Sequence, residues 1–449
     1  MDKLAILGGN PVRKGPFPME MPQINQADID EVVDVLRKRC LSIFSSTKIV
    51  EFENEFAEFA GTKYAVALTS CTATIQTSLA AASIGLGDEV IVPVYTYMAT
   101  VNGVLLQNAT PVFVDTAPNS FNLDVSKVEE RITSKTKAIL VVDLFGNPAP
   151  RNLLMDLAQK YGLFLIEDCA QSTGAEIHGQ RVGRFGIGCH SFGEIKNITS
   201  AEGGMITTND PEIARKARIV RHEGEVWRHN HATTIGQSPS RLVDMIEGID
   251  YEMIGHNYRM NALQAALGNS QLKRIDQINK RRINIAESYN QALQNIPQIQ
   301  MPKIEKDAKP VYNRFAIILD PEFHLSRNAF LAALISEGVP AGVYYPKPLN
   351  RAHIFSKNLG EGRISHPFIP LLESNADYSE EFPNAELVCK QQVLLPCYPE
   401  MQIADAESVS NAIEKVLKAT ADPSIAELLE QKVSSIRAEY FGQFFTLSN

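Results

Sequence analysis

One lysine in the sequence stands in a setting that could make it a nucleophile. Lys196 lies in a polar turn between Ser191-Phe192 and Glu202-Gly203-Gly204, which leads into an apolar, threonine-rich segment. A lysine amine attacks a carbonyl carbon to form a Schiff base only when it is neutral, which requires burial or a neighbouring cation. A lone lysine in a turn is more often a solvated surface residue, so other residues must decide whether Lys196 is reactive.

An aspartate at the end of an apolar stretch is the second candidate. Asp168 follows Phe164-Leu165-Ile166, a segment with the character of a buried strand. A carboxylate at that depth is costly unless a cation or strong donors accompany it, although an aspartate there can also cap a helix. The separation from Lys196 leaves room for one connection and one further strand, which favours a shared site over a simple cap.

A third feature is a turn rich in hydroxyl groups. Residues 64–68 predict a short apolar strand, residues 69–74 (TSCTAT) a turn, and residues 75–83 a helix. The first amides of a helix are unpaired, and its dipole favours negative charge there, so this turn could bind an anion. Because serine and threonine also cap ordinary helices, the pattern alone favours capping.

These residues follow elements that alternate between strand and helix. The sequence predicts strands over 89–92, 110–114, 138–142 and 163–167 and helices over 98–106 and 153–161. Strands that are apolar throughout and separated by helices indicate an α/β fold with a mostly parallel sheet covered on both faces. Ligands of such folds bind at the carboxyl ends of the strands. We therefore expect the site in the loops that begin at Thr69, Pro93, Asp143, Asp168 and Ser191.

Composition excludes several classes of function. The chain has 449 residues, 44% of them hydrophobic and 21% charged, and a net charge of −9 without a basic track, so we expect no nucleic-acid partner. The sequence contains neither a signal peptide nor an apolar stretch of about 18 residues, so we expect no membrane partner. The six scattered cysteines form no CxxC pair, which predicts no metal site and no disulfides and fits reduced thiols in the cytoplasm.

The length predicts a large domain and a smaller one. We expect a proline-rich arm over 1–24, a large domain over 25–260 and a linking helix within 261–295, with its amphipathic pattern over 262–293. A small C-terminal domain follows over 296–420, with strands at 315–319 and 341–345 and a helix at 327–337. Residues 421–449 predict an additional helical tail of unknown purpose.

Together the lysine, the aspartate and the hydroxyl-rich turn match the needs of pyridoxal 5′-phosphate (PLP). A lysine forms a Schiff base with this cofactor, and a carboxylate pairs with its ring nitrogen. A helix N-terminus with hydroxyl groups holds its phosphate, and an aromatic side chain stacks on its ring. Each feature is weak alone, but their order along an α/β chain is much more specific.

The chain also resembles the DegT, DnrJ, EryC and StrS family of sugar aminotransferases. The similarity extends from about Pro16 to Tyr398 and rests on residues 93–100 (PVYTYMAT), 111–115 (PVFVD), 166–172 (IEDCAQS), 191–196 (SFGEIK), 202–204 (EGG) and 255–260 (GHNYRM). It implies the fold of type I PLP transferases, with a three-layer α/β/α large domain, a mostly parallel sheet and a smaller α+β C-terminal domain.

The resemblance implies roles for individual residues. Lys196 would form the Schiff base and move a proton, and Asp168 would pair with the ring nitrogen. Gln171 would reach the hydroxyl side of the ring, and Tyr97 would stack over it. The phosphate would be held by the Cys71 amide, Thr72, Ser191 and, from across a subunit interface, Asn257. An obligate homodimer with two shared active sites follows from that last role.

The chain departs from the family pattern near these positions. Cys71 stands where glycine is frequent, Ala201 replaces a usual glycine, and Asn350 stands where histidine is frequent. The triplet before the lysine, residues 193–195 (GEI), is unusual. Some relatives carry histidine in place of the lysine and act as dehydratases, and Lys196 argues against that reaction.

The resemblance implies an aminotransferase that works in two stages. Glutamate or glutamine would donate the amino group, and a keto-sugar or keto-cyclitol would accept it, in amino-sugar, antibiotic or other secondary-metabolite biosynthesis. Candidate substrate residues are Glu194, Tyr345 and Lys347. Two alternatives remain: a PLP-dependent lyase or dehydratase of the same family, and a regulatory homologue that binds PLP without turnover.

Overall fold

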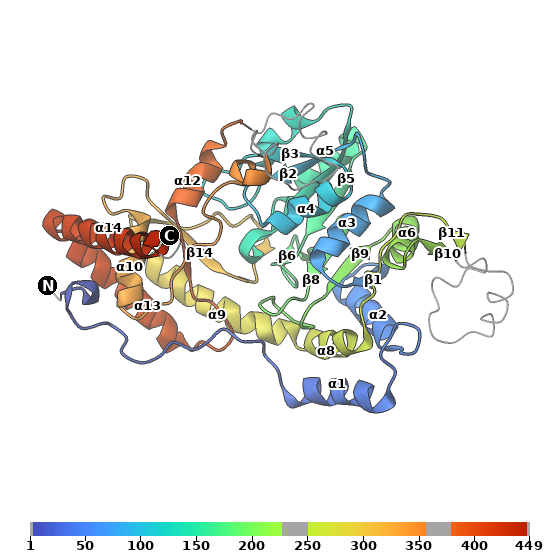
Figure 1. Cartoon of the computed structure of the whole chain (residues 1–449), viewed down its shortest axis with the longest axis horizontal. Coiled ribbons are helices and arrows are strands. Elements are labelled where there is room, and N and C mark those ends of the chain that lie inside the picture. The colour runs from blue at the N-terminus through green and yellow to red at the C-terminus, as the bar shows by residue number, and fades with distance from the viewer. Residues whose placement is uncertain (1–2, 227–249, 356–378, 447–449) are drawn as a thin grey trace.

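A seven-stranded sheet forms the centre of the larger part of the molecule (Figure 1). The computed structural model describes residues 3–226, 250–355 and 379–446, with side chains described as far as residue 436. In spatial order the strands are β1 (Tyr64–Leu68), β9 (Gly204–Thr208), β8 (Ile187–Ser191), β5 (Phe164–Asp168), β4 (Thr136–Val142), β2 (Glu89–Pro93) and β3 (Thr110–Val114).

The sheet is mostly parallel, as the sequence predicts. Strands β8, β5, β4, β2 and β3 pair in parallel. Strand β9 runs antiparallel to both β8 and β1, so β1 has the same direction as the parallel strands. The carboxyl ends of β1, β2, β4, β5 and β8 therefore lie along one edge, which brings the five predicted loops to the same side of the sheet.

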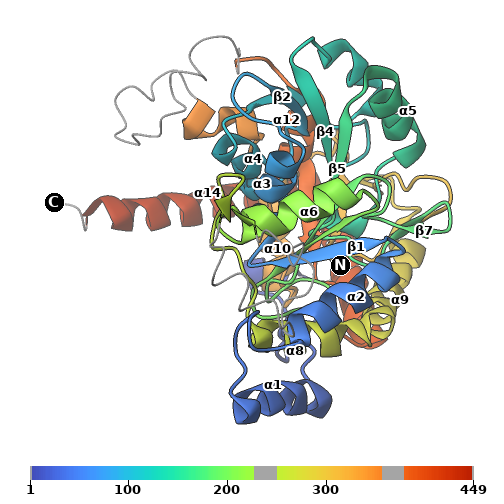
Figure 2. The same ribbon diagram turned by 90° about the vertical axis from the view of Figure 1, so that its right-hand side faces the viewer.

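Helices cover both faces of this sheet and complete three layers. On β1, Val66 and Leu68 pack with one face, whereas Ala65 and Ala67 pack with the other. Figure 2 shows β1 between α6 and α2. One face is covered by α3 (Cys71–Ala81), α4 (Met98–Leu106) and α6 (Pro211–Arg221), and the other by α2 (Lys48–Ala60), α8 (Ala262–Leu272) and α5 (Arg151–Tyr161).

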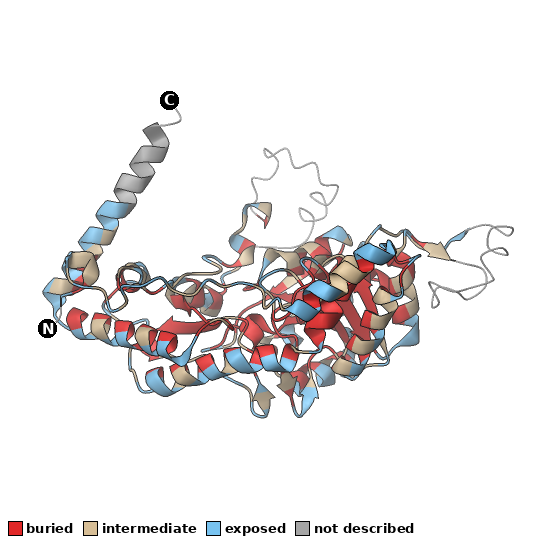
Figure 3. Cartoon of the chain, turned by 90° about the horizontal axis from the view of Figure 1, so that it is seen from below, coloured by how far each residue is buried: buried red, intermediate tan, exposed pale blue. Residues whose placement is uncertain are grey.

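A second hydrophobic core lies beside the first. It gathers around an antiparallel sheet of β12 (Ile299–Gln300), β14 (Phe315–Leu319) and β15 (Gln392–Leu395). Helices α9 (Ile275–Leu293), α10 (Arg327–Ser336), α13 (Ile403–Thr420) and α14 (Pro423–Thr446) pack around that sheet. Figure 3 shows the buried residues inside both parts. The domain boundaries given above stay a prediction.

The remaining elements are short or peripheral. Helix α1 (Gln26–Lys38) begins with a capping box between Asn25 and Asp28 and packs on α8. The others are α12 (Pro383–Gln391), β6 (Glu176–Ile177), β7 (Gln180–Arg181), β10 (Glu225–Val226), β11 (Asp250–Tyr251) and β13 (Ala308–Lys309). In the part of the chain that is described, no helix combines the length and apolar character needed to cross a membrane.

Three predicted elements differ from the structure. The helix predicted over 75–83 begins at Cys71, because Ser70 caps it with its side chain. The helix predicted over 262–293 is interrupted, and Arg274 at the break donates to Gln23 O and Asp28 Oδ2 of the N-terminal segment. The strand predicted over 341–345 is reduced to a single bridge at Gly342, in a stretch bounded by prolines on both sides.

Candidate active site

Lys196 lies in the turn that follows β8. Its backbone amide donates to Gly193 O at 3.0 Å, which closes the turn. Burial lowers the pKa of Lys196, and the positive charge of Arg314 lowers it further, whereas Cys71 and Asp168 act in the opposite direction. A partly desolvated amine of this kind is neutral more often than a surface lysine, as Schiff-base chemistry requires.

Asp168 ends β5 and is buried with polar hydrogen-bond partners. Its Oδ2 accepts from Thr100 Oγ1 at 2.8 Å, and its Oδ1 accepts from the Ala170 amide at 3.0 Å. The Cys71 thiol lies 3.8 Å from Oδ1. Burial raises the pKa of this carboxyl group. Among the described residues no ion pair compensates the charge, so a cationic ligand group would stabilise Asp168 here.

The hydroxyl-rich turn, Cys71 and Ser191 come together at the same edge of the sheet. Ser70 Oγ accepts from the Ala73 amide, so the amides of Cys71 and Thr72 are the first of α3. Ser191 pairs with Gly204 across β8 and β9, and Gly204 also pairs with the last residue of β1. A Cβ on Gly204 would lie 2.5 Å from Ser70 O, which explains the need for glycine at this close approach.

Gln171 connects two other parts of the site. Its Oε1 accepts from the Phe145 amide at 2.8 Å, and its Nε2 donates to the Tyr345 hydroxyl at 3.2 Å. The Tyr345 ring lies 6.3 Å from the ring of Tyr97, which stands exposed at the start of α4. The structure thus brings Tyr97 and Gln171, predicted to bind the cofactor, together with Tyr345, predicted to contact the substrate, and these roles stay predictions.

The other predicted site residues are less closely connected. Glu194 is exposed and lines a cleft together with Lys196. Lys347 is exposed next to the Tyr345 loop, and Asn257 is exposed beside its bridge to His222. Their predicted roles stay predictions.

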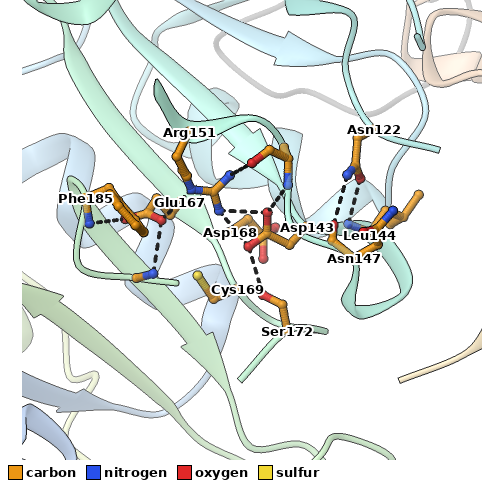
Figure 4. A network of polar contacts seen from close by, with 12 residues as sticks. Asn122, Asp143, Leu144, Asn147, Arg151, Glu167, Asp168, Cys169, Ser172 and Phe185 are labelled. Carbon is orange, nitrogen blue, oxygen red and sulfur yellow. Dashed lines mark hydrogen bonds and ion pairs between the residues drawn. The ribbon is translucent and has the colours of Figure 1, made fainter. Parts of the chain in front are cut away.

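A buried ionic network beneath the site was missed by sequence reasoning (Figure 4). The Arg151 guanidinium donates to Asp143 at 2.6 and 2.7 Å and to Glu167 Oε2 at 2.8 Å, and all three residues are fully buried. Glu167 also accepts from the amides of three residues after β5, namely Gly183, Phe185 and Gly186. Removing one partner of such a network lowers the free energy of unfolding by about 3–5 kcal/mol, because it leaves a buried charge without its counterpart. The sequence signal that could have revealed this network is Glu167, an acidic residue within an otherwise apolar strand, directly before Asp168.

Three buried asparagines, which sequence reasoning also missed, form a series of hydrogen bonds to the turn that contains Lys196. Asn313 Nδ2 donates to Ile195 O at 3.2 Å and lies 3.4 Å from Asn197 Oδ1, so it contacts both neighbours of Lys196. Asn197 Nδ2 then donates to Asn279 Oδ1 at 2.7 Å. Asn279 Nδ2 donates to the carbonyl of Thr173 at 3.1 Å, in the segment that follows Gln171. No local pattern predicts side-chain pairs this far apart in sequence.

Ala201 shows the physical consequence of one departure from the family pattern. Its φ is +68°, in the left-handed region that favours glycine, and its amide donates to Thr199 Oγ1 at 2.9 Å. A side chain in this conformation costs about 1–2 kcal/mol, which the surrounding turn must offset.

Comparison with known proteins then assigns the family. The sequence model described as the DegT/DnrJ/EryC1/StrS aminotransferase family matches residues 22–414. The chain belongs to this aminotransferase family. Its members are PLP-dependent, and the chain is accordingly a PLP-dependent transaminase with the fold of sugar aminotransferases.

Individual relatives in the family align over most of their length. The UDP-N-acetyl-3-dehydro-alpha-D-glucosamine 3-aminotransferase of Acidithiobacillus ferrooxidans is 33% identical over 367 residues, which cover 81% of this chain and 87% of the relative. An aminotransferase from Psychrobacter cryohalolentis superposes with a TM-score of 0.77 at 28% identity and covers 90% of this chain and 99% of its own. A putative sugar aminotransferase from Streptococcus pneumoniae, solved in its PMP form, superposes with a TM-score of 0.75 at 25% identity and covers 91% of this chain and 100% of its own.

The residues of this aminotransferase fit PLP. Asp168 is a buried carboxylate that forms no ion pair with any described residue, which suits a protonated ring nitrogen. The start of α3 offers amides and hydroxyls suited to a phosphate. Lys196 is an amine with a lowered pKa, which suits an aldehyde.

Proposed function

We propose that this aminotransferase transfers the amino group of glutamate or glutamine to a keto group on a sugar. The single observation that carries the proposal is the presence, in one site, of a desolvated Lys196 and a buried Asp168 whose carboxylate accepts from Thr100 and the Ala170 amide and forms no ion pair within the described residues. The name of the Acidithiobacillus relative supports a nucleotide-linked 3-keto sugar as the acceptor. A keto-cyclitol is the second acceptor to be tested.

The residues of the chain have distinct tasks in this proposal. PLP, when bound, supplies an electron sink for the bond broken at the α-carbon of the donor. Lys196 Nζ takes the proton from that carbon and, in the second stage, delivers one to the former carbonyl carbon of the acceptor. Asp168, fixed by Thr100, pairs with the ring nitrogen.

Binding and orientation fall to the remaining residues. Tyr97 covers the ring, and Gln171, fixed by Phe145 and Tyr345, faces its hydroxyl side. The phosphate is held by the Cys71 amide, Thr72 and Ser191 at the start of α3 and the end of β8. Glu194, Tyr345 and Lys347 are proposed to contact the substrates.

We further propose a homodimer and a cytoplasmic location. The exposed side chain of Asn257 is available to reach the phosphate site of a second copy. All six cysteines are free thiols, five of them buried, which supports a reducing compartment.

The test compares Lys196→Ala with Lys418→Ala, an exposed lysine on α13. We expect the native protein and the Lys418 variant to change the absorbance of bound PLP on addition of glutamate or glutamine and to aminate a UDP-linked 3-keto sugar. The Lys196 variant should lose both reactions. Elimination of water or another group without amine transfer would instead establish the lyase. PLP binding without reaction with any donor would establish the regulatory homologue.

A further inference from the structure

A glutamate of the N-terminal arm lies between two arginines next to the active-site lysine. Glu20 Oε1 accepts from Arg314 Nη1 at 2.5 Å and lies 3.9 Å from Arg282 Nη2. Arg282 is buried, and its Nη1 donates to the Asn313 and Cys397 carbonyls at 3.3 and 2.7 Å. Two guanidinium groups around one carboxylate form a strong carboxylate site.

This pair of arginines lies close to Lys196. Arg314 follows Asn313, whose side chain donates to the carbonyl of the residue before the lysine. Glu20, Lys196 and Arg282 line one cleft. The charge of Arg314 contributes to lowering the pKa of Lys196 after the larger effect of burial. A carboxylate on Arg314 would thus be near the amine that reacts.

The stretch of the arm around Glu20 is largely exposed. Its flanking residues Met19 and Met21 are 74% and 58% exposed, and the Glu20 side chain itself is 26% exposed. The arm is fixed on either side of this stretch, where Tyr398 donates to Pro18 O and Gln271 donates to Gln23 O. The Arg314 side chain, 12% exposed, would remain in place when Glu20 leaves.

We propose that Arg314, with Arg282 behind it, binds the α-carboxylate of the amino donor, and that Glu20 occupies this site when no donor is bound. The inference rests on the proposed function, in which one site receives two unlike substrates in turn. The donor carries an α-carboxylate, whereas the keto-sugar acceptor does not. Glu20 neutralises Arg314 during the second stage, when an unpaired buried cation would be costly.

The test uses Arg314→Gln, Glu20→Gln and, as a matched control, Arg215→Gln, which removes an exposed ion pair on α6. The affinity of the PLP-loaded protein for α-methylglutamate, which has no α-proton to transfer, is measured by calorimetry. We expect Arg314→Gln to weaken binding about 10- to 100-fold, because a charge-assisted hydrogen bond is lost. Glu20→Gln should strengthen binding about threefold to tenfold, because the competitor for the site is gone. The control variant Arg215→Gln should bind α-methylglutamate with the native affinity.

A second measurement separates a carboxylate site from a general structural effect. The rate of reaction with 1-phenylethylamine, a donor without a carboxylate, should fall by a much smaller factor in Arg314→Gln than the affinity for α-methylglutamate does, because that amine senses only the loss of the Arg314 charge near Lys196. Arg314→Lys should recover part of the affinity for α-methylglutamate. Equal losses for both amines, or unchanged binding in both variants, would overturn the inference. Calorimetry needs no turnover, so a protein that binds α-methylglutamate through Arg314 but aminates no sugar would refute only the proposed function.

Discussion

At the scale of single residues, the site depends on groups whose charge state is set by burial. His190 precedes Ser191 on β8 and is buried, with both ring nitrogens 3.3 Å from threonine hydroxyls, those of Thr173 and Thr207. Its ring meets the ring of Phe56 edge to face, with the two centroids 4.9 Å apart. Burial lowers the pKa of His190 to about 3, so the ring is neutral in the folded protein at ordinary pH.

This burial predicts a pH dependence of stability. Below the ordinary pKa of 6.5, the unfolded chain binds a proton at His190 that the folded protein does not bind until pH about 3. The free energy of unfolding should therefore fall with pH across that window by about 1.4 kcal/mol per unit from this residue alone, and it should be independent of His190 above pH 7. Urea unfolding at several pH values should show the slope in the native protein and in His178→Gln, an exposed control.

The His190→Gln variant should have a smaller slope, because glutamine does not titrate. An equal slope in that variant would mean that the acid sensitivity arises from other groups, such as the paired carboxylates.

At the scale of elements, the sequence predicted what is local and missed what is paired over distance. The strand ends at Asp168 and Ser191 were predictable because apolar runs followed by polar residues mark such ends. Helix α4 was predicted with its bounds. The break between α8 and α9 was not, because it contains no glycine or proline and depends on Arg274 reaching the segment before α1. The Arg151 network and the asparagine chain were missed for the same reason.

Asn279 joins α9 to the lysine turn and gives a prediction at this scale. Asn279→Leu keeps the volume but leaves Asn197 Nδ2 and the Thr173 carbonyl without this partner in a buried place. At about 1–3 kcal/mol for each unsatisfied group, we expect a loss of roughly 2–5 kcal/mol in the free energy of unfolding. Because the turn loosens, we also expect slower reaction of Lys196 with PLP, followed by absorbance.

The matched control is Asn290→Ala on the same helix, whose side chain makes a long hydrogen bond of 3.5 Å to the Tyr312 hydroxyl. It should leave the rate of PLP binding unchanged. If both variants bind PLP at the native rate, the asparagine chain contributes to stability alone.

At the scale of the whole molecule, two cores meet at the lysine turn, and α14 extends the second core beyond the region matched by the family. The family match ends at residue 414, before α14 begins. Helix α14 packs on α10 and α13. Glu430 accepts from the amide and hydroxyl of Ser326, at 2.6 and 2.9 Å, where Ser326 caps α10. The tail therefore stabilises a helix of the second core.

Two adjacent leucines of α14 test this role. Leu429 is fully buried in the second core, whereas Leu428 is 50% exposed. Leu429→Ala should lower the free energy of unfolding by about 2–5 kcal/mol, because it removes buried methyl groups and leaves a cavity. Leu428→Ala should lower it by less than about 0.5 kcal/mol. Urea unfolding measures both, and the kcat of the PLP-loaded protein should stay unchanged in both variants, since neither leucine belongs to the proposed site. Equal effects of the two substitutions would mean that α14 does not pack on the second core in solution, and a fall in kcat for Leu429→Ala alone would connect the tail to catalysis.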